Sequence, residues 1–126
     1  MGETVVKVTI RGPRGSRTVE AVMDTGATNT TIERGLAQQF GIAAIDRQEV
    51  VLANGISDTI DVGSAELKIQ GTTRVVPVFI YDTNLIGLTT LEAAGLRVNP
   101  ITRQLENVPG KLLGLRLKDA ALLQNA

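Results

Sequence analysis

The groups best able to do chemistry in this chain are carboxylates. The sequence contains no Cys and no His, which excludes thiol catalysis, disulfides, Cys/His zinc sites and every Ser-His or Cys-His nucleophile pair. Carboxylates, Lys, Tyr and hydroxyl groups remain. One acid has an unusual position, because Asp24 follows the apolar pair Val22-Met23 and leads into Thr25-Gly26-Ala27-Thr28. A carboxylate is therefore expected where a strand breaks into a glycine turn.

The Asp24 segment allows two interpretations. An Asp-Thr-Gly sequence alone is more often a turn than a catalytic site. The turn interpretation weakens here because an apolar strand precedes the acid, a capped helix is predicted after it, and a second apolar-apolar-glycine turn follows at Leu85-Ile86-Gly87. Five other aspartates lack this setting and are interpreted as solvated loop or cap residues: Asp46, Asp58, Asp61, Asp82 and Asp119.

Mostly β-strands are predicted around these turns. Runs rich in β-branched residues, separated by turn-forming clusters, predict three hairpins: 4–10 with 18–23, 50–53 with 56–62, and 65–69 with 73–81. Asn54-Gly55 tolerates positive φ and suits a tight turn in the second hairpin. The run 73–81 is the most continuously apolar, as expected of a strand that is buried on both faces.

Two short helices are predicted from one repeated pattern. Thr30-Thr31-Ile32-Glu33 and Thr89-Thr90-Leu91-Glu92 are capping-box signatures, and Gly41 and Gly95 supply the C-terminal stops. An apolar strand and a glycine turn precede each pattern. This echo suggests a weak internal duplication of strand, glycine turn and helix.

Length and charge limit the class of protein. A chain of 126 residues with 43% hydrophobic and 21% charged residues indicates a globular protein with one modest core. The 13 acidic residues balance the 13 Lys and Arg, so no basic excess indicates a nucleic-acid or membrane partner. No apolar run approaches the length of a bilayer span and no signal peptide is recognised, so we expect a cytoplasmic location.

The three motifs together resemble those of the retropepsin-like aspartic peptidases, particularly the small prokaryotic branch. The segment 24–28 is similar to the family's catalytic Asp-Thr/Ser-Gly-Ala motif, Leu52-Ala53-Asn54-Gly55 to its Ala-Asn-Gly flap segment, and Leu85-Ile86-Gly87 to the turn behind its active-site loop. The resemblance covers most of the chain. It implies a mainly β fold, a closed retropepsin-like β-barrel with one or two short helices. The expected peptidase domain spans 1–108, and 109–126 is a tail, either an interface strand or disordered.

The resemblance also implies roles for the active-site loop. Asp24 would supply one carboxylate of a pair that shares a proton and activates a water, and the second would come from another copy in a homodimer. Thr25 would hydrogen-bond across the two-fold axis, and Gly26 would permit close approach. Ala27 would leave room for substrate, and the Thr28 hydroxyl would support the outer carboxylate oxygen.

A flap and a substrate class follow from the same resemblance. Ala53, Asn54, Gly55 and Ile56 would close over an extended peptide or protein substrate. Only two Phe and one Tyr are present, so aliphatic pocket walls are expected. No cofactor and no metal is expected. One departure from the family pattern is Leu88, which stands where many members carry a polar or charged residue.

Two functions from different classes are compatible with these features. The first is an aspartic endopeptidase that hydrolyses peptide bonds. The second is a catalytically silent dimeric module that binds peptides or proteins in the same cleft. The intact motif favours the enzyme, because a binding module does not need a supported acid. A metal-dependent hydrolase ranks third, because the chain has no His and no clustered carboxylate set.

Overall fold

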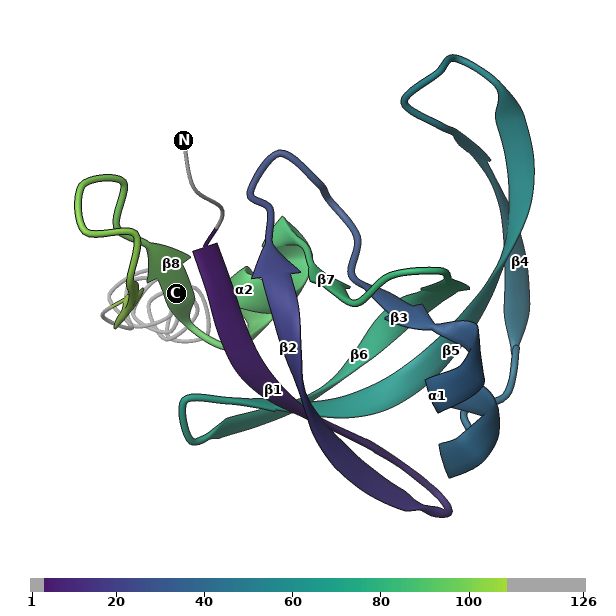
Figure 1. The fold of residues 1–126 in the computed structure, drawn as a ribbon, viewed down its shortest axis with the longest axis horizontal. Helices are drawn as coiled ribbons and strands as arrows, with labels where there is room; N and C mark the ends of the chain where they lie inside the picture. Colours follow the sequence, from purple (N-terminus) through teal and green to yellow (C-terminus); the bar gives the residue numbers. More distant parts are fainter. Residues whose placement is uncertain (1–3, 109–126) are drawn as a thin grey trace, which may run out of the picture. The chain divides into compact units, whose positions relative to one another are not determined.

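A computed structural model describes residues 4–108. Tertiary contacts divide the chain into two compact units, Met1–Ala94 and Gly95–Ala126. The predicted tail at 109–126, with Asp119, lies outside the described residues. The elements of the first unit (Figure 1) are β1 (Thr4–Gly12), β2 (Gly15–Met23), β3 (Thr31–Glu33), α1 (Arg34–Phe40), β4 (Asp46–Val51), β5 (Ser57–Ile69), β6 (Thr72–Tyr81), β7 (Leu85–Ile86) and α2 (Leu88–Ala93).

Strands of the first unit close into a barrel. The hydrogen-bonded order is β1-β2-β7-β3-β6-β5, and β5 returns to pair with β1, where Ile10 lies opposite Leu67. The ring therefore has no free edge. β4 continues the sheet outward from β5 (Figure 1). The predicted closed, mainly β fold with two short helices is confirmed.

The first hairpin is longer than predicted. β1 and β2 stay paired up to Gly12 opposite Gly15, so Pro13-Arg14 alone forms the turn. The hairpin end packs against α1, since the Arg14 N–H donates to the Phe40 carbonyl at 3.0 Å. A Cβ at Gly12 would lie 2.4 Å from that same oxygen. Glycine at position 12 therefore allows the helix to contact the hairpin backbone.

β5 is one continuous strand, whereas the sequence predicts two separate runs. Its first half pairs with β4 and its second half with β6. The junction passes through Gly63, where a Cβ would lie 2.8 Å from the Ala43 carbonyl oxygen. The glycine lets the chain between α1 and β4 cross closely over the strand.

The prediction that β6 is buried on both faces is wrong for its first half. Val76 and Val78 face the interior, while Val75, on the opposite face of the strand, is 71% exposed. Consecutive burial begins only at Val78 and continues through Phe79 and Ile80. Phe79 is buried because it packs against Ile60 and Val62 of β5, on the side of the β4–β5 hairpin.

Neither helix begins at its predicted capping box. Thr31–Glu33 forms β3, which pairs with β6 and β7, and α1 starts only at Arg34. α2 starts at Leu88, so Thr90 lies inside it. Neither helix has a side-chain hydrogen bond at its N-cap. Gly41, with φ of 72°, ends α1 as predicted.

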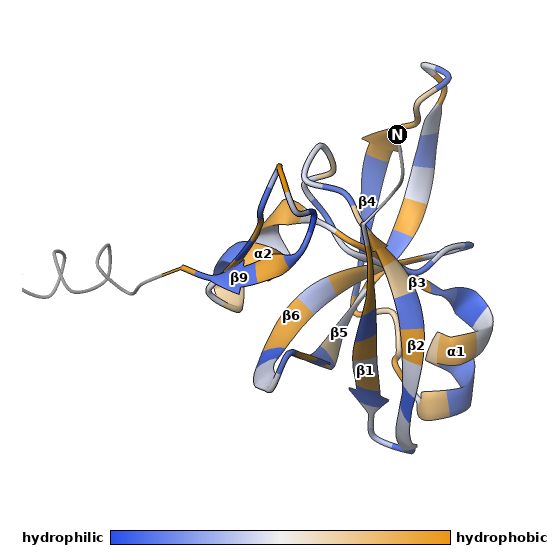
Figure 2. Cartoon of the chain, turned by 60° about the vertical axis from the view of Figure 1, so that its left-hand side comes forward, coloured by the Kyte–Doolittle hydropathy of each residue, from blue (hydrophilic) through white to orange (hydrophobic). Residues whose placement is uncertain are grey.

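The core consists of apolar side chains from nearly every element of the first unit. Figure 2 shows apolar and polar residues alternating along β1 and β2, as expected for strands with one face inward. No helix in the described part of the chain is long and apolar enough to span a membrane. The buried apolar residues of the first unit are Val8, Ile10, Ala21, Met23, Ile32, Leu36, Ala37, Phe40, Ile42, Ile60, Val62, Ala65, Leu67, Ile69, Val76, Val78, Phe79, Ile80, Ile86, Leu91 and Ala94.

The described part of the second unit is a hairpin of β8 (Leu96–Val98) and β9 (Leu105–Asn107). Arg97 and Glu106 lie opposite each other and form an ion pair at 2.6 Å. Hydrogen bonds from Asn99 and from Arg97 hold the pKa of the Glu106 carboxyl below its ordinary value. These contacts link the two strands with the loop that joins them.

Candidate active site

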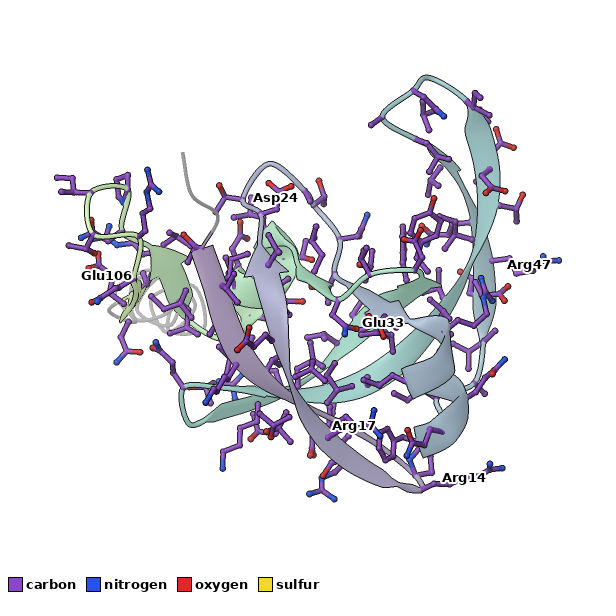
Figure 3. All side chains as sticks on the ribbon, viewed as in Figure 1. Arg14, Arg17, Asp24, Glu33, Arg47 and Glu106 are labelled. Carbon is purple, nitrogen blue, oxygen red and sulfur yellow. The ribbon has the colours of Figure 1, made fainter. Side chains whose placement is uncertain are left out.

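Asp24 lies in an exposed loop directly after β2 (Figure 3). β2 runs parallel to β7, and the pairing extends into the loop because the Asp24 N–H donates to the Ile86 carbonyl at 3.0 Å. The Asp24 carbonyl accepts from the Ala27 N–H at 3.1 Å. The backbone on both sides of the acid is therefore held by hydrogen bonds while its side chain stays open to solvent.

The Asp24 carboxylate is oriented by the backbone of Gly26. The Gly26 N–H donates to Asp24 Oδ1 at 2.9 Å. A Cβ at Gly26 would lie 3.1 Å from the same oxygen, so even a methyl group would crowd the carboxylate. Glycine at position 26 therefore leaves room beside Oδ1 of the Asp24 carboxylate.

The turn at Leu85-Ile86-Gly87 passes behind the Asp24 loop. The Leu88 N–H donates to the Ala27 carbonyl at 2.8 Å. The Gly87 backbone lies so close to Asn29 that a Cβ at Gly87 would be 2.5 Å from its carbonyl carbon and oxygen. The structure therefore brings together the two glycine turns that the sequence places about sixty residues apart.

The other loop residues differ in how they are held. Thr25 and Thr28 are exposed, and Ala27 is half-buried. The Thr28 carbonyl accepts from both the N–H and the hydroxyl of Thr89, at 3.2 and 2.8 Å. The Thr28 hydroxyl forms no hydrogen bond with the Asp24 carboxylate within the described residues, so its expected support of that group stays a prediction.

A buried pair of hydroxyl groups underlies the loop. Thr30 and Thr90 are 1% and 2% exposed, and their Oγ1 atoms lie 2.6 Å apart. Thr30 Oγ1 also accepts from the Gly87 N–H at 3.0 Å. Sequence reasoning missed this contact because it interpreted both Thr-Thr patterns as helix caps. The repetition of the Thr-Thr pattern in both halves of the chain was the signal that could have indicated this contact.

The predicted flap residues form the tip of the β4–β5 hairpin. The Gly55 N–H donates to the Leu52 carbonyl at 2.9 Å, and the Leu52 N–H to the Ile56 carbonyl at 2.9 Å. Gly55 has a φ of 83°, while Asn54 keeps a negative φ and accepts from the Ile56 N–H through Oδ1 at 3.0 Å. Ala53, Asn54 and Gly55 therefore form a three-residue loop with glycine in the left-handed position, rather than a two-residue turn.

The hairpin tip and the Asp24 loop lie at the same end of the first unit (Figures 1 and 2). Near the barrel the hairpin rests on an apolar cluster, which we call the flap cluster: Ile60, Val62, Phe79, Val50, Leu52 and Tyr81. Ile56, next to the tip, is 61% exposed, and Val51, on the opposite face from Val50 and Leu52, is 72% exposed. The base of the hairpin is thus packed, while its tip presents apolar side chains to solvent.

A comparison with known protein families identifies the family to which this chain belongs. Residues 6–115 match the model of the aspartyl protease family, which is most of the chain. The chain belongs to the aspartyl protease family. Its barrel, its two glycine turns and its Asp-Thr-Gly loop have the retropepsin-like form of that family. Among curated proteins, no sequence matches the chain.

The other aspartates within 4–108 lie in different settings. Asp46, Asp58 and Asp61 are strand residues in β4 and β5, so their interpretation as loop or cap residues is wrong. Asp82 lies in the bend after β6, as expected. No cluster of three or more acids placed to hold a metal ion occurs within 4–108. Among the aspartates that the structure describes, Asp24 is the one that follows a barrel strand into a glycine turn.

Proposed function

We propose that this aspartyl protease is a homodimeric endopeptidase in which two Asp24 carboxylates, one from each subunit, activate the hydrolytic water. The observation that carries the proposal is the position of Asp24. It is exposed, its backbone is hydrogen-bonded on both sides, and its carboxylate is oriented by the Gly26 N–H. Residues 4–108 supply one such acid, and a pair requires a second copy.

The pair of carboxylates would divide the chemistry between them. Two carboxyl groups about 3 Å apart cannot both ionise easily and so share one proton. The ionised group accepts a proton from water as the oxygen attacks the carbonyl carbon of the peptide bond, and the protonated group donates to the carbonyl oxygen. Proton transfer to the amide nitrogen then breaks the C–N bond and releases two peptides.

Features of the Asp24 loop support its pairing with a second copy. Thr25 and Gly26 are exposed beside the acid, so the loop is open to an identical loop across a two-fold axis. The Gly87 turn and the Thr30–Thr90 pair support it from behind. A loop held in this way loses little conformational freedom when the second copy arrives.

The hairpin tip would close over an extended substrate. Its exposed Ile56, which lies opposite Leu52 on the same face as Val50, would supply apolar surface for a peptide. Closure would exclude water other than the one that reacts. A cytoplasmic location would require that the pair works near neutral pH.

The test is cleavage of a quenched fluorescent peptide library by the purified protein and by Asp24→Asn. We expect Asp24→Asn to lower kcat by at least about a thousandfold, within the range for loss of a general acid or base. Asp82→Asn is the matched control, because Asp82 is also an exposed aspartate at the end of a strand. Equal cleavage by wild type and Asp24→Asn would refute the assignment.

The second candidate function is a silent binding module, and one further measurement distinguishes it from an endopeptidase. A peptide isostere that carries a hydroxyl group in place of the scissile carbonyl should bind an aspartic endopeptidase far more tightly than the parent peptide. A binding module should hold the two equally. Peptide binding without cleavage and without this preference would favour the module.

A further inference from the structure

One acid of the β4–β5 hairpin has no role in the catalytic proposal. Asp58 lies in β5, directly opposite Val50 in β4. Because side chains alternate along a strand, Asp58 shares its face with Ile60 and Val62. Those two residues are 7% and 5% exposed and belong to the flap cluster. Asp58 therefore lies on the inner face of the hairpin, one step nearer the tip than Ile60 and directly opposite Val50 of the same cluster.

The Asp58 carboxylate has no cationic partner in the part of the chain that the structure describes. It accepts one hydrogen bond, from the N–H of the adjacent Thr59 at 2.8 Å. Asp61 differs, since it lies on the opposite face and pairs with Arg47 at 3.1 Å and Arg34 at 3.7 Å. The acid on the outer face is neutralised within the chain, and the acid on the inner face is not.

The apolar surroundings of Asp58 let its carboxylate distinguish cationic from anionic ligand groups. Its cross-strand neighbour Val50 and the nearby Leu52 are apolar and half-buried. A carboxylate beside apolar side chains is screened less by water once a ligand covers it. It then favours a cation and opposes an anion. A Lys or Arg side chain meets both needs, because its methylene stem packs on aliphatic groups and its charge reaches the carboxylate.

We propose that Asp58 is a specificity-determining residue, and that it selects substrates with Lys or Arg at the subsite beneath the inner face of the hairpin. The inference rests on the proposed function, in which an extended peptide lies between this face and Asp24. In the homodimer, Asp58 of each subunit would act at equivalent distances on either side of the scissile bond. The preferred substrate would carry a basic residue next to aliphatic ones in each half.

The experiment compares peptides that differ at one position, with Lys, Gln or Glu, for every position across the cleavage site. The wild-type protein should show a kcat/KM for the best Lys peptide about tenfold above that for the Glu peptide, the scale expected of one ion pair at a partly covered site. Asp58→Asn should reduce that ratio to near one, and Asp58→Lys should invert it. High salt should reduce it in the wild type.

Glu49→Gln is the matched control. Glu49 is another exposed acid of the same hairpin, but it lies opposite Thr59 on the outer face. We expect it to keep both basal cleavage and the Lys/Glu ratio. A wild-type ratio near one at every position, or equal loss in Glu49→Gln and Asp58→Asn, would overturn the role of Asp58.

A binding measurement separates this inference from the catalytic proposal. The affinity of the same Lys, Gln and Glu peptides is measured with Asp24→Asn and with the double variant Asp24→Asn/Asp58→Asn, neither of which needs to cleave. A Lys preference that Asp58→Asn removes would support the inference even if the wild type cleaves nothing. The absence of any preference in binding would overturn it even if the wild type cleaves peptides.

Discussion

The hydroxyl groups of Thr30 and Thr90 lie 2.6 Å apart in the interior of the barrel unit. The contact joins the segment that follows the Asp24 loop to the helix that follows Gly87. Because Thr30 Oγ1 also accepts from the Gly87 N–H, three polar groups satisfy one another where water is excluded. This small polar network lies behind the Asp24 loop and joins it to the Gly87 turn.

Thr30→Val should destabilise the fold. It leaves the Gly87 N–H and the Thr90 hydroxyl buried without their partner, which costs about 1–3 kcal/mol per unsatisfied group. Thr90→Val should cost less, because Thr30 still accepts from Gly87. Thr18→Val is the control, since Thr9 and Thr18 form an exposed hydroxyl pair at 2.8 Å, and its effect should stay within about 0.5 kcal/mol. Urea unfolding measures all three, and equal effects would contradict the network.

Two glycine substitutions should separate stability from activity. Gly87→Ala places a Cβ 2.5 Å from the Asn29 backbone, and overpacking of this kind costs about 1–3 kcal/mol. Gly26→Ala meets only Asp24 Oδ1, at 3.1 Å, so it should displace the carboxylate and lower kcat with little loss of stability.

Gly35→Ala is the control for both. Gly35 lies in α1, and a methyl group added there would meet nothing within 4 Å apart from its chain neighbours and the backbone of its own helix, so alanine should stabilise the helix by about 0.5–1 kcal/mol. Thermal unfolding and peptide cleavage are measured for all three variants. A Gly26→Ala variant with wild-type kcat would show that the Asp24 carboxylate tolerates displacement.

The hairpin tip should gain protection when a substrate mimic binds. The Gly55 and Leu52 amides are held only by the hydrogen bonds of the turn itself, so they should exchange quickly in the free protein. Hydrogen exchange with and without a hydroxyl-bearing peptide isostere tests this. The Arg14 amide, bonded to Phe40 in the β1–β2 turn, should be unchanged. Equal exchange at the hairpin tip with the isostere bound would count against a flap.

Activity should require two copies of Asp24. When wild type is mixed with excess Asp24→Asn under exchanging conditions, most wild-type chains enter heterodimers with one acid. Cleavage per wild-type chain should then fall in proportion to the wild-type fraction, and it should also fall on dilution below the dimer dissociation constant. Cleavage per wild-type chain that is independent of the added variant would rule out the shared pair.

Local patterns were enough to predict the hairpins and the two glycine turns. Alternating β-branched residues at 4–10 and 18–23 determine a hairpin because strand preference and turn chemistry act between neighbours in the chain. The Asp24 motif was recognisable for the same reason, since its acid, glycine and preceding strand are consecutive. Gly41 ended α1 as predicted because a left-handed residue stops a helix locally.

The roles of Thr30 and Thr31 depended on partners far away in the sequence, and the surroundings of Asp58 depended on how its hairpin packs. Thr31 is in a strand because β6 and β7 lie on either side of it, and Thr30 bonds Thr90 instead of capping a helix. The face on which Asp58 lies follows from the register of β4 with β5 and from the cluster beneath them. Sequence alone determined the three hairpins of the barrel unit and where the candidate acid lies. Tertiary structure decided which polar groups meet, because a buried hydroxyl or an unpaired carboxylate depends on what packs beside it.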